Sequence, residues 1–132
     1  QSANNYSIEI DTPNDRYNIY FKETLKRFFN VSGIKTKYIL KTRITFESLE
    51  TLSVSGQNIL KSTKARINYQ LTNKITNIVI KSGSITTSPT LSSLSNSLYT
   101  QEKSIEHIKE RLTKSSAKTL YTRINIIIRR LS

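Results

Sequence analysis

The stretch KYILKTRITFE, residues 37–47, decides the fold of this chain. One set of alternate positions holds Tyr38, Leu40, Thr42, Ile44 and Phe46, and the other set holds Lys37, Ile39, Lys41, Arg43, Thr45 and Glu47. Alternation with a period of two over this length is typical of a β-strand with one face on a core and the other in water. The stretch therefore predicts a long, half-buried strand.

Two more strands are expected after this one. Residues 63–71 alternate in the same way, with Thr63, Ala65, Ile67, Tyr69 and Leu71 facing inward, and residues 78–85 form a third run. Turn residues separate the runs at positions 55–58 and 73–77. Three consecutive runs of this kind predict an antiparallel meander. Residues 82–97 are rich in Ser and Thr and contain Pro89, so we expect a strand end followed by a long loop.

Helical patterns flank the strands. Residues 6–10 predict a short opening strand, and Asn14 or Asp15 can cap a helix whose aromatic stripe, at helical spacing, ends before Gly33. We expect that aromatic stripe to face the core, because its spacing follows the helix. The alternative is an exposed platform on which nucleic-acid bases stack. Apolar residues from Ile105 to Leu131 recur at three- and four-residue steps and predict a second helix.

These elements predict an α+β fold in which two helices pack on one face of a four-stranded, largely antiparallel sheet, in the order β-α-β-β-β-α. The length of 132 residues fits a single domain covering 1–132, and we expect residues 1–5 to be disordered. The uncovered sheet face would then present side chains that are nearly all cationic: Lys37, Lys41, Arg43, Lys64 and Arg66.

Charge indicates the class of partner. The chain has 21 Lys and Arg residues against 9 Asp and Glu, a formal net charge of +12, and a pI near 10.1. This balance points to nucleic acid, acidic lipid headgroups or an acidic protein. The alternative is a biased composition, because the chain is also rich in Ile, Asn, Ser and Thr, and lysine can accumulate for the same reason.

The residue types favour binding over catalysis. The chain has no cysteine, His107 is its one histidine, and no acidic residue lies between Thr51 and Gln101. A general base needs an oriented partner, and the sequence shows none for His107. The three glycines of the chain form no phosphate-binding loop. We therefore expect a protein that is not an enzyme and uses no cofactor and no metal.

One cluster of cations is the candidate ligand site. In an antiparallel meander, Lys61 and Lys64 lie near the turn between the first two long strands, and Lys103 opens the second helix. We expect these three residues to share one pole, with Arg66 next to them, and to bind phosphate groups.

A series of weak features resembles the LPS-assembly lipoprotein family LptE, in its alphaproteobacterial form. The features run in order from the opening strand through Tyr38-Ile39-Leu40 and Thr63-Lys64-Ala65-Arg66. They continue with Lys81-Ser82-Gly83 and Leu98-Tyr99-Thr100, and end at Arg129-Arg130-Leu131. The resemblance covers about residues 8–131. It departs from the family in lacking the lipid-carrying cysteine and a clear small-acidic pair in the last helix.

The resemblance implies an outer-membrane protein on the periplasmic face of a Gram-negative bacterium. Its expected partners are lipopolysaccharide, an LptD-like β-barrel in which it sits as a plug, and the membrane, through a lipid anchor upstream of Gln1. A second hypothesis is a basic nucleic-acid-binding module, although the basic sheet face lacks aromatic side chains for stacking. A third is a pilotin-like structural subunit with no ligand of its own.

Overall fold

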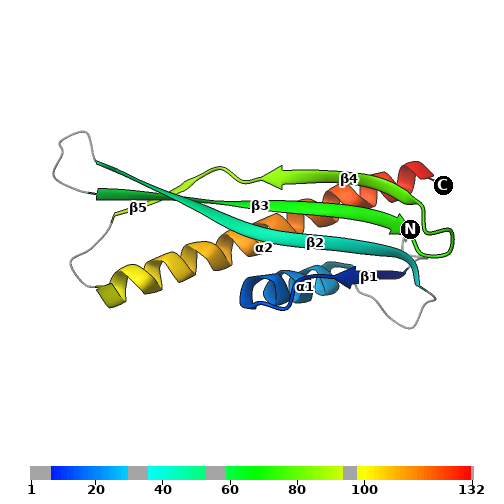
Figure 1. Ribbon diagram of the computed structural model, residues 1–132, viewed down its shortest axis with the longest axis horizontal. Helices are drawn as coiled ribbons and strands as arrows, with labels where there is room; N and C mark the ends of the chain where they lie inside the picture. Colours follow the sequence, from blue (N-terminus) through cyan, green and yellow to red (C-terminus); the bar gives the residue numbers. More distant parts are fainter. Residues whose placement is uncertain (1–6, 30–35, 53–58, 94–97, 132) are drawn as a thin grey trace.

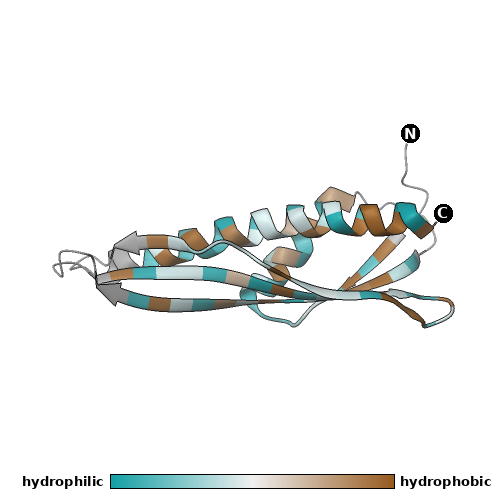
Figure 2. Cartoon of the chain, turned by 90° about the horizontal axis from the view of Figure 1, so that it is seen from above, coloured by the Kyte–Doolittle hydropathy of each residue, from teal (hydrophilic) through white to brown (hydrophobic). Residues whose placement is uncertain are grey.

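The computed structural model describes residues 7–29, 36–52, 59–93 and 98–131. Its elements are β1 (Ser7–Asp11), α1 (Arg16–Phe29), β2 (Thr36–Leu52), β3 (Ile59–Asn73), β4 (Val79–Thr86), β5 (Thr90–Ser93) and α2 (Leu98–Leu131) (Figure 1). Both helices lie on the same side of an elongated sheet (Figure 2). The predicted α+β fold, with two helices on one face of a mostly antiparallel sheet, is confirmed.

The sheet has the order β1-β2-β3-β4, with β5 also paired to β3. The β2–β3 and β3–β4 pairs are antiparallel, as the meander predicts, whereas β1 pairs with β2 in parallel. Parallel neighbours need a crossover connection, and α1 supplies it. The start of β1 therefore lies at the same end of the molecule as the start of β2 and the β3–β4 turn (Figure 1).

The strand β5 was not expected, because its residues fall in the stretch predicted as a loop. It pairs antiparallel with the first part of β3, while β4 pairs with the second part. Thr87 joins the two pairings: its N–H donates to the Ala65 carbonyl and its Oγ1 accepts from the Ala65 N–H, each at 2.9 Å. The short Ser- and Thr-rich strand is thus held by an existing edge and not by apolar alternation.

One hydrophobic core lies between the sheet and the helices. Its fully buried side chains include Phe21 and Leu25 of α1, Leu40 of β2, Ile67 and Leu71 of β3, and Leu120 and Ile124 of α2. The inward positions predicted for the long strands are buried or half-buried, as expected. The aromatic stripe of α1 is core and not a stacking platform, because Phe21 and Phe29 are buried and Phe28 stacks on Tyr121.

Polar contacts fix the start of α1 on the sheet. The Asp15 carboxylate accepts a hydrogen bond from the Asn18 N–H at 3.1 Å, so Asp15 is the helix cap. Asn18 itself is buried and bonds both backbone groups of Ile44 in β2, accepting from its N–H at 2.8 Å and donating to its carbonyl at 3.2 Å. The predictions for residues 1–5, Gly33 and the turn at 55–58 lie outside the described residues.

Candidate functional site

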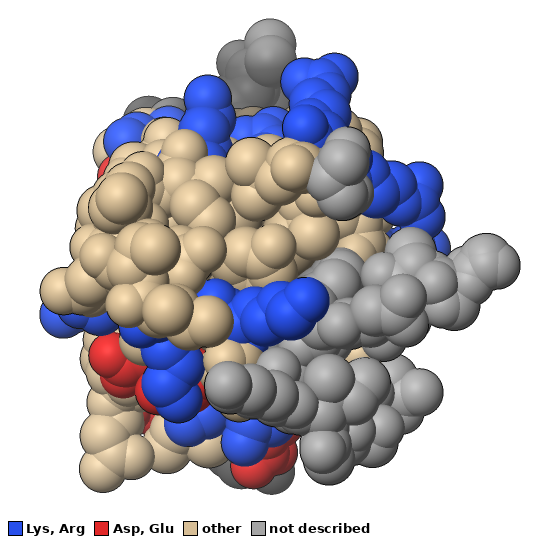
Figure 3. Space-filling model, turned by 90° about the vertical axis from the view of Figure 1, so that its right-hand side faces the viewer, with Lys and Arg blue, Asp and Glu red and all other residues tan. Residues whose placement is uncertain are grey.

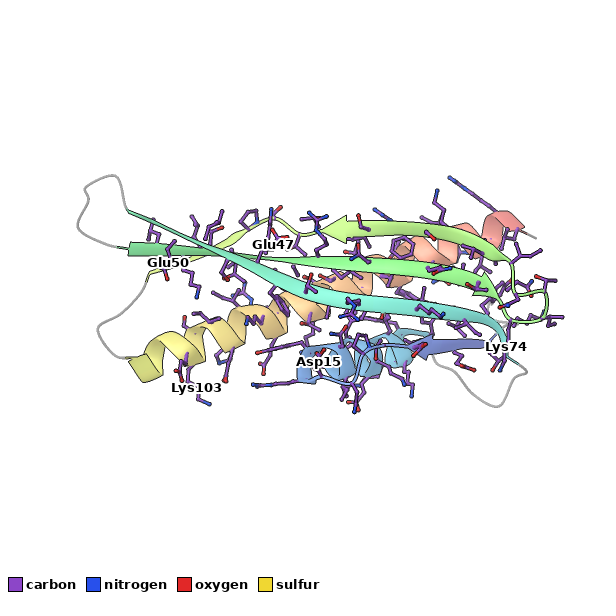
Figure 4. All side chains as sticks on the ribbon, viewed as in Figure 1. Asp15, Glu47, Glu50, Lys74 and Lys103 are labelled. Atoms are coloured by element: carbon purple, nitrogen blue, oxygen red, sulfur yellow. The ribbon has the colours of Figure 1, made fainter. Side chains whose placement is uncertain are left out.

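The four predicted ligand-binding cations lie in one half of the molecule but on both faces of the sheet. Lys61, Lys64 and Arg66 belong to β3, and Lys103 belongs to the second turn of α2. Strand alternation places Lys61 on the helix side and Lys64 and Arg66 on the open side. Figure 4 shows Lys103 in the same half as Glu47 and Glu50, the β2 residues that pair with Lys64 and Lys61.

Carboxylates lie among these cations. The ion pairs are Lys64–Glu47 at 3.6 Å, Arg66–Glu47 at 3.9 Å and Lys103–Glu106 at 3.6 Å. Lys61 is directly opposite Glu50 in the strand register. Exposed pairs contribute only about 0–1 kcal/mol each, yet they lower the positive potential that would attract an anion. Phosphate binding by these four residues stays a prediction.

The expectation that the open sheet face is nearly all cationic is wrong. The parallel strand β1 adds Glu9 and Asp11 to this face, and Asp11 is registered directly with Lys41. Glu9 also pairs with Lys74 across 3.2 Å. The physical reason is tertiary: the carboxylates arrive from a strand distant in sequence from the cations that they neighbour.

Two further acidic residues, both on α2, form ion pairs where α1 meets α2. Arg16 lies 3.4 Å from Glu106 and 3.8 Å from Glu110. The hydrogen bond from Arg16, followed by the charge of Lys103, lowers the pKa of Glu106. Burial raises the pKa of Tyr17, the aromatic side chain beneath Arg16. These acids are therefore held in contacts between elements, and the chain has no acidic residue after Glu110.

Several cations gather between β4 and the second half of α2. A groove of about 640 Å³ there is lined by four cationic side chains, Lys81, Lys118, Arg123 and Arg130, together with Tyr69, Thr119, Thr122, Ile126 and Ile127. We call it the cationic groove. Within the residues that the structure describes, none of its four cations forms an ion pair with a carboxylate.

Local sequence explains the shape of the cationic groove. Thr119, Arg123, Ile126 and Arg130 recur at three- and four-residue steps, so they form one stripe of α2 beside the stripe that enters the core. On the sheet, Tyr69 is registered with Gly83, and a Cβ at Gly83 would lie 2.6 Å from the Tyr69 hydroxyl. The missing side chain of Gly83 therefore lets the Tyr69 ring lie across β4 and form part of the groove wall.

A second groove continues the same band of charge between α1 and α2. It has a volume of about 570 Å³ and is lined by Thr24, Arg27, Phe28, Arg111, Lys114, Ser115 and Lys118. Lys118 lines both grooves, so cations follow α2 from its middle to its last turn. Each groove combines an apolar wall with several positive charges, which suits an anionic amphiphile: the charges pair with phosphate or carboxylate and the walls contact hydrocarbon.

Two further features of the described part of the chain concern metal binding and membrane crossing. No cluster of three or more His, Asp or Glu side chains there could hold a metal ion. His107 is an exposed side chain on α2. In the helices described, no segment is both long and apolar enough to cross a membrane.

The residues of the cationic groove were not singled out from the sequence. The available signal was the acid-free end of the chain, where Arg111, Lys114, Lys118, Arg123, Arg129 and Arg130 follow Glu110. Only the pairing of β4 with β3, and the packing of α2 on β3, bring Lys81 to the same place.

Comparison with known proteins identifies the fold. No family model matches the chain, and a search of curated proteins finds no significant match. Solved structures do match. A candidate lipoprotein from Caulobacter crescentus CB15 has a TM-score of 0.75 and 12% identity, with 98% of this chain and 96% of that chain covered.

Two further lipoproteins give the same result. Rare lipoprotein B from Shewanella oneidensis has a TM-score of 0.74 and 9% identity, covering 95% of this chain and 98% of its own. An uncharacterized lipoprotein B from Nitrosomonas europaea has a TM-score of 0.68 and 14% identity, covering 91% and 82%. The chain thus has a fold found in small bacterial lipoproteins.

Proposed function

We propose that this chain is a non-enzymatic lipopolysaccharide-assembly lipoprotein of the LptE type, which acts at the periplasmic face of the outer membrane. In this role it binds lipopolysaccharide and partners an LptD-like β-barrel as a plug. The observation that carries the proposal is the cationic groove, in a fold that bacterial lipoproteins share. The sequence resemblance to LptE points in the same direction.

The groove has the chemistry that lipid A requires. The phosphates of lipid A are anionic, and Lys118, Arg123 and Arg130 form no ion pair with a carboxylate in the described ranges of the chain. Hydrogen bonds between ionised partners are about twice as strong as neutral ones. Ile126, which is 44% exposed, and the half-buried Ile127 provide apolar surface for the first part of an acyl chain. The expected mechanism is non-covalent capture, with no bond made or broken in the lipid.

Two variants of equal charge change test the proposal. In one, Lys118, Arg123 and Arg130 become Glu; in the other, Lys61, Lys64 and Lys103 become Glu. We expect the first variant to bind purified lipopolysaccharide at least about tenfold more weakly than the parent protein, since each charged hydrogen bond contributes roughly 1.5–3 kcal/mol. The second variant should lose less affinity, because carboxylates already lie beside its cations.

Further binding measurements distinguish lipopolysaccharide recognition from the alternative functions. Dephosphorylated lipid A should bind more weakly than lipid A, as phosphate recognition demands. Equal losses of lipopolysaccharide affinity in both variants would mean that binding depends on net charge alone. Tighter, salt-dependent binding of oligonucleotides than of lipopolysaccharide would support the nucleic-acid module instead. Co-purification with a co-expressed LptD-like barrel tests the plug role independently of the groove.

A further inference from the structure

The turn between β3 and β4 presents aliphatic side chains to solvent. Ile75, Ile78 and Val79 are 72%, 64% and 46% exposed. The hairpin tip is coloured as hydrophobic and projects from the sheet layer on the side away from α2 (Figure 2). Exposing neighbouring aliphatic residues at a projecting tip is unfavourable in water, so this feature calls for a partner.

Hydrogen bonds hold the tip in this shape. The Asn73 side-chain oxygen accepts from the N–H groups of Ile75 and Thr76, at 2.9 and 3.1 Å. The Asn73 backbone closes the turn through the Ile78 carbonyl at 2.9 Å and the Asn77 N–H at 2.8 Å. Asn77 has a φ of 62°, a left-handed conformation that asparagine tolerates better than most residues. Ile75 and Ile78 are therefore presented to solvent by a turn of defined, hydrogen-bonded conformation.

Cations surround the tip. Lys74 lies within the turn and pairs with Glu9 across 3.2 Å, and the Lys37 carbonyl accepts a hydrogen bond from the Lys74 N–H at 2.9 Å. Lys81 follows in β4 and forms no ion pair among the described residues. Arg129 and Arg130 close α2 at the same end of the molecule (Figure 1). Figure 3 views this end directly: Lys and Arg border an uncharged surface, and acidic atoms are few and lie mainly in its lower part.

Size and charge select the partner. A stable protein interface buries about 800 Å² on each side, which is more than a projecting tip of three aliphatic side chains offers. A lipid surface needs no matching shape, accepts aliphatic side chains among its acyl chains and attracts nearby Lys and Arg when it is anionic. We propose that this end of the molecule docks on an anionic lipid bilayer, with Ile75 and Ile78 entering the interface and the surrounding cations facing the headgroups.

Vesicle binding tests the proposal with the whole chain. The probe is vesicles of phosphatidylethanolamine and phosphatidylglycerol, with phosphatidylcholine vesicles as the neutral comparison. Replacing Ile75 and Ile78 with Ser should lower partitioning at least about tenfold, since roughly two aliphatic side chains leave the hydrocarbon. The matched control replaces Leu49 and Leu91 with Ser, because these are 68% and 65% exposed in the opposite half. Circular dichroism confirms that both variants fold.

A fluorescent label reports the orientation. The chain has no cysteine, so Thr76→Cys and Leu91→Cys each accept a single environment-sensitive dye. With anionic vesicles the dye at position 76 should shift to the blue, and the dye at position 91 should stay in water. The proposal is overturned if neither dye shifts, if both shift equally, or if neutral vesicles bind as well as anionic ones. Self-association that disappears in the Ile75 and Ile78 variant, without vesicle binding by the parent, also overturns it.

Discussion

Replacing Asn18 with Ala tests how α1 is attached to the sheet. Asn18 is 3% exposed, and its amide bonds both the N–H and the carbonyl of Ile44, two groups on the edge of β2 that β1 does not reach. The β1–β2 pairing stops at Asp11 and Lys41. The Asn18 side chain therefore continues the ladder in place of a strand, and its loss leaves two buried backbone groups without partners.

The size of the effect follows from those two groups. Each buried polar group left unsatisfied costs about 1–3 kcal/mol, and the contact to the carbonyl is the longer one at 3.2 Å. We expect Asn18→Ala to lower the free energy of unfolding by about 2–4 kcal/mol, which is a large share of the roughly 5–15 kcal/mol of a typical domain. The melting temperature should fall on the order of 10 °C.

Urea unfolding measures the loss, and amide hydrogen exchange locates it. The matched control is Asn14→Ala, an exposed asparagine just before the helix, which should change stability by less than about 0.5 kcal/mol. Exchange at the Ile44 amide should accelerate in Asn18→Ala and stay slow in the control. An Asn18→Ala protein as stable as the parent, or an unchanged Ile44 amide, would refute the reasoning.

Three other substitutions have defined outcomes. Gly83→Ala should cost about 1–3 kcal/mol, because the added Cβ displaces the buried Tyr69 ring, and the cost should shrink in a Tyr69→Leu background. Asp15→Ala should cost about 0.5–2 kcal/mol through loss of the helix cap. Hydrogen bonds from Asn18 lower the pKa of Asp15, so the folded protein binds a proton at Asp15 more weakly than the unfolded chain does. The stability that Asp15 contributes is therefore present above about pH 4 and is lost as the pH falls through the pKa of the folded state. Leu120→Ala should cost about 2–5 kcal/mol, since Leu120 is fully buried.

Urea unfolding at several pH values checks all three. Leu49→Ala is the control for Leu120→Ala, because Leu49 is 68% exposed. An equal cost at both leucines would contradict the assignment of the core. A Gly83→Ala penalty that persists without the Tyr69 ring would place the strain elsewhere. A stability difference between Asp15→Ala and the parent that grows as the pH falls would reverse the sign argued for the cap.

The sequence by itself determined the elements that depend on near neighbours. Alternation at Leu40, Thr42 and Ile44 predicted a half-buried strand, and those residues are buried. The same reasoning placed two more strands, both helices and the layer arrangement, and it narrowed the helix cap to Asn14 or Asp15, of which the structure selects Asp15. These features are readable because side-chain direction repeats every two residues in a strand and about every 3.6 in a helix, whatever the rest of the chain does.

The tertiary structure alone decided which of the described cations lie beside carboxylates. Glu9 reaches the open face through a parallel strand, and Arg16 meets Glu106 from ninety positions away. The sequence placed the candidate site at Lys61, Lys64, Lys103 and Arg66. In the part of the chain that the structure describes, cations that form no ion pair gather where Lys81 meets the last turns of α2. Electrostatic potential depends on the distances between charges in space. Those distances cannot be read from positions along the chain, because they are set by strand pairing and helix packing.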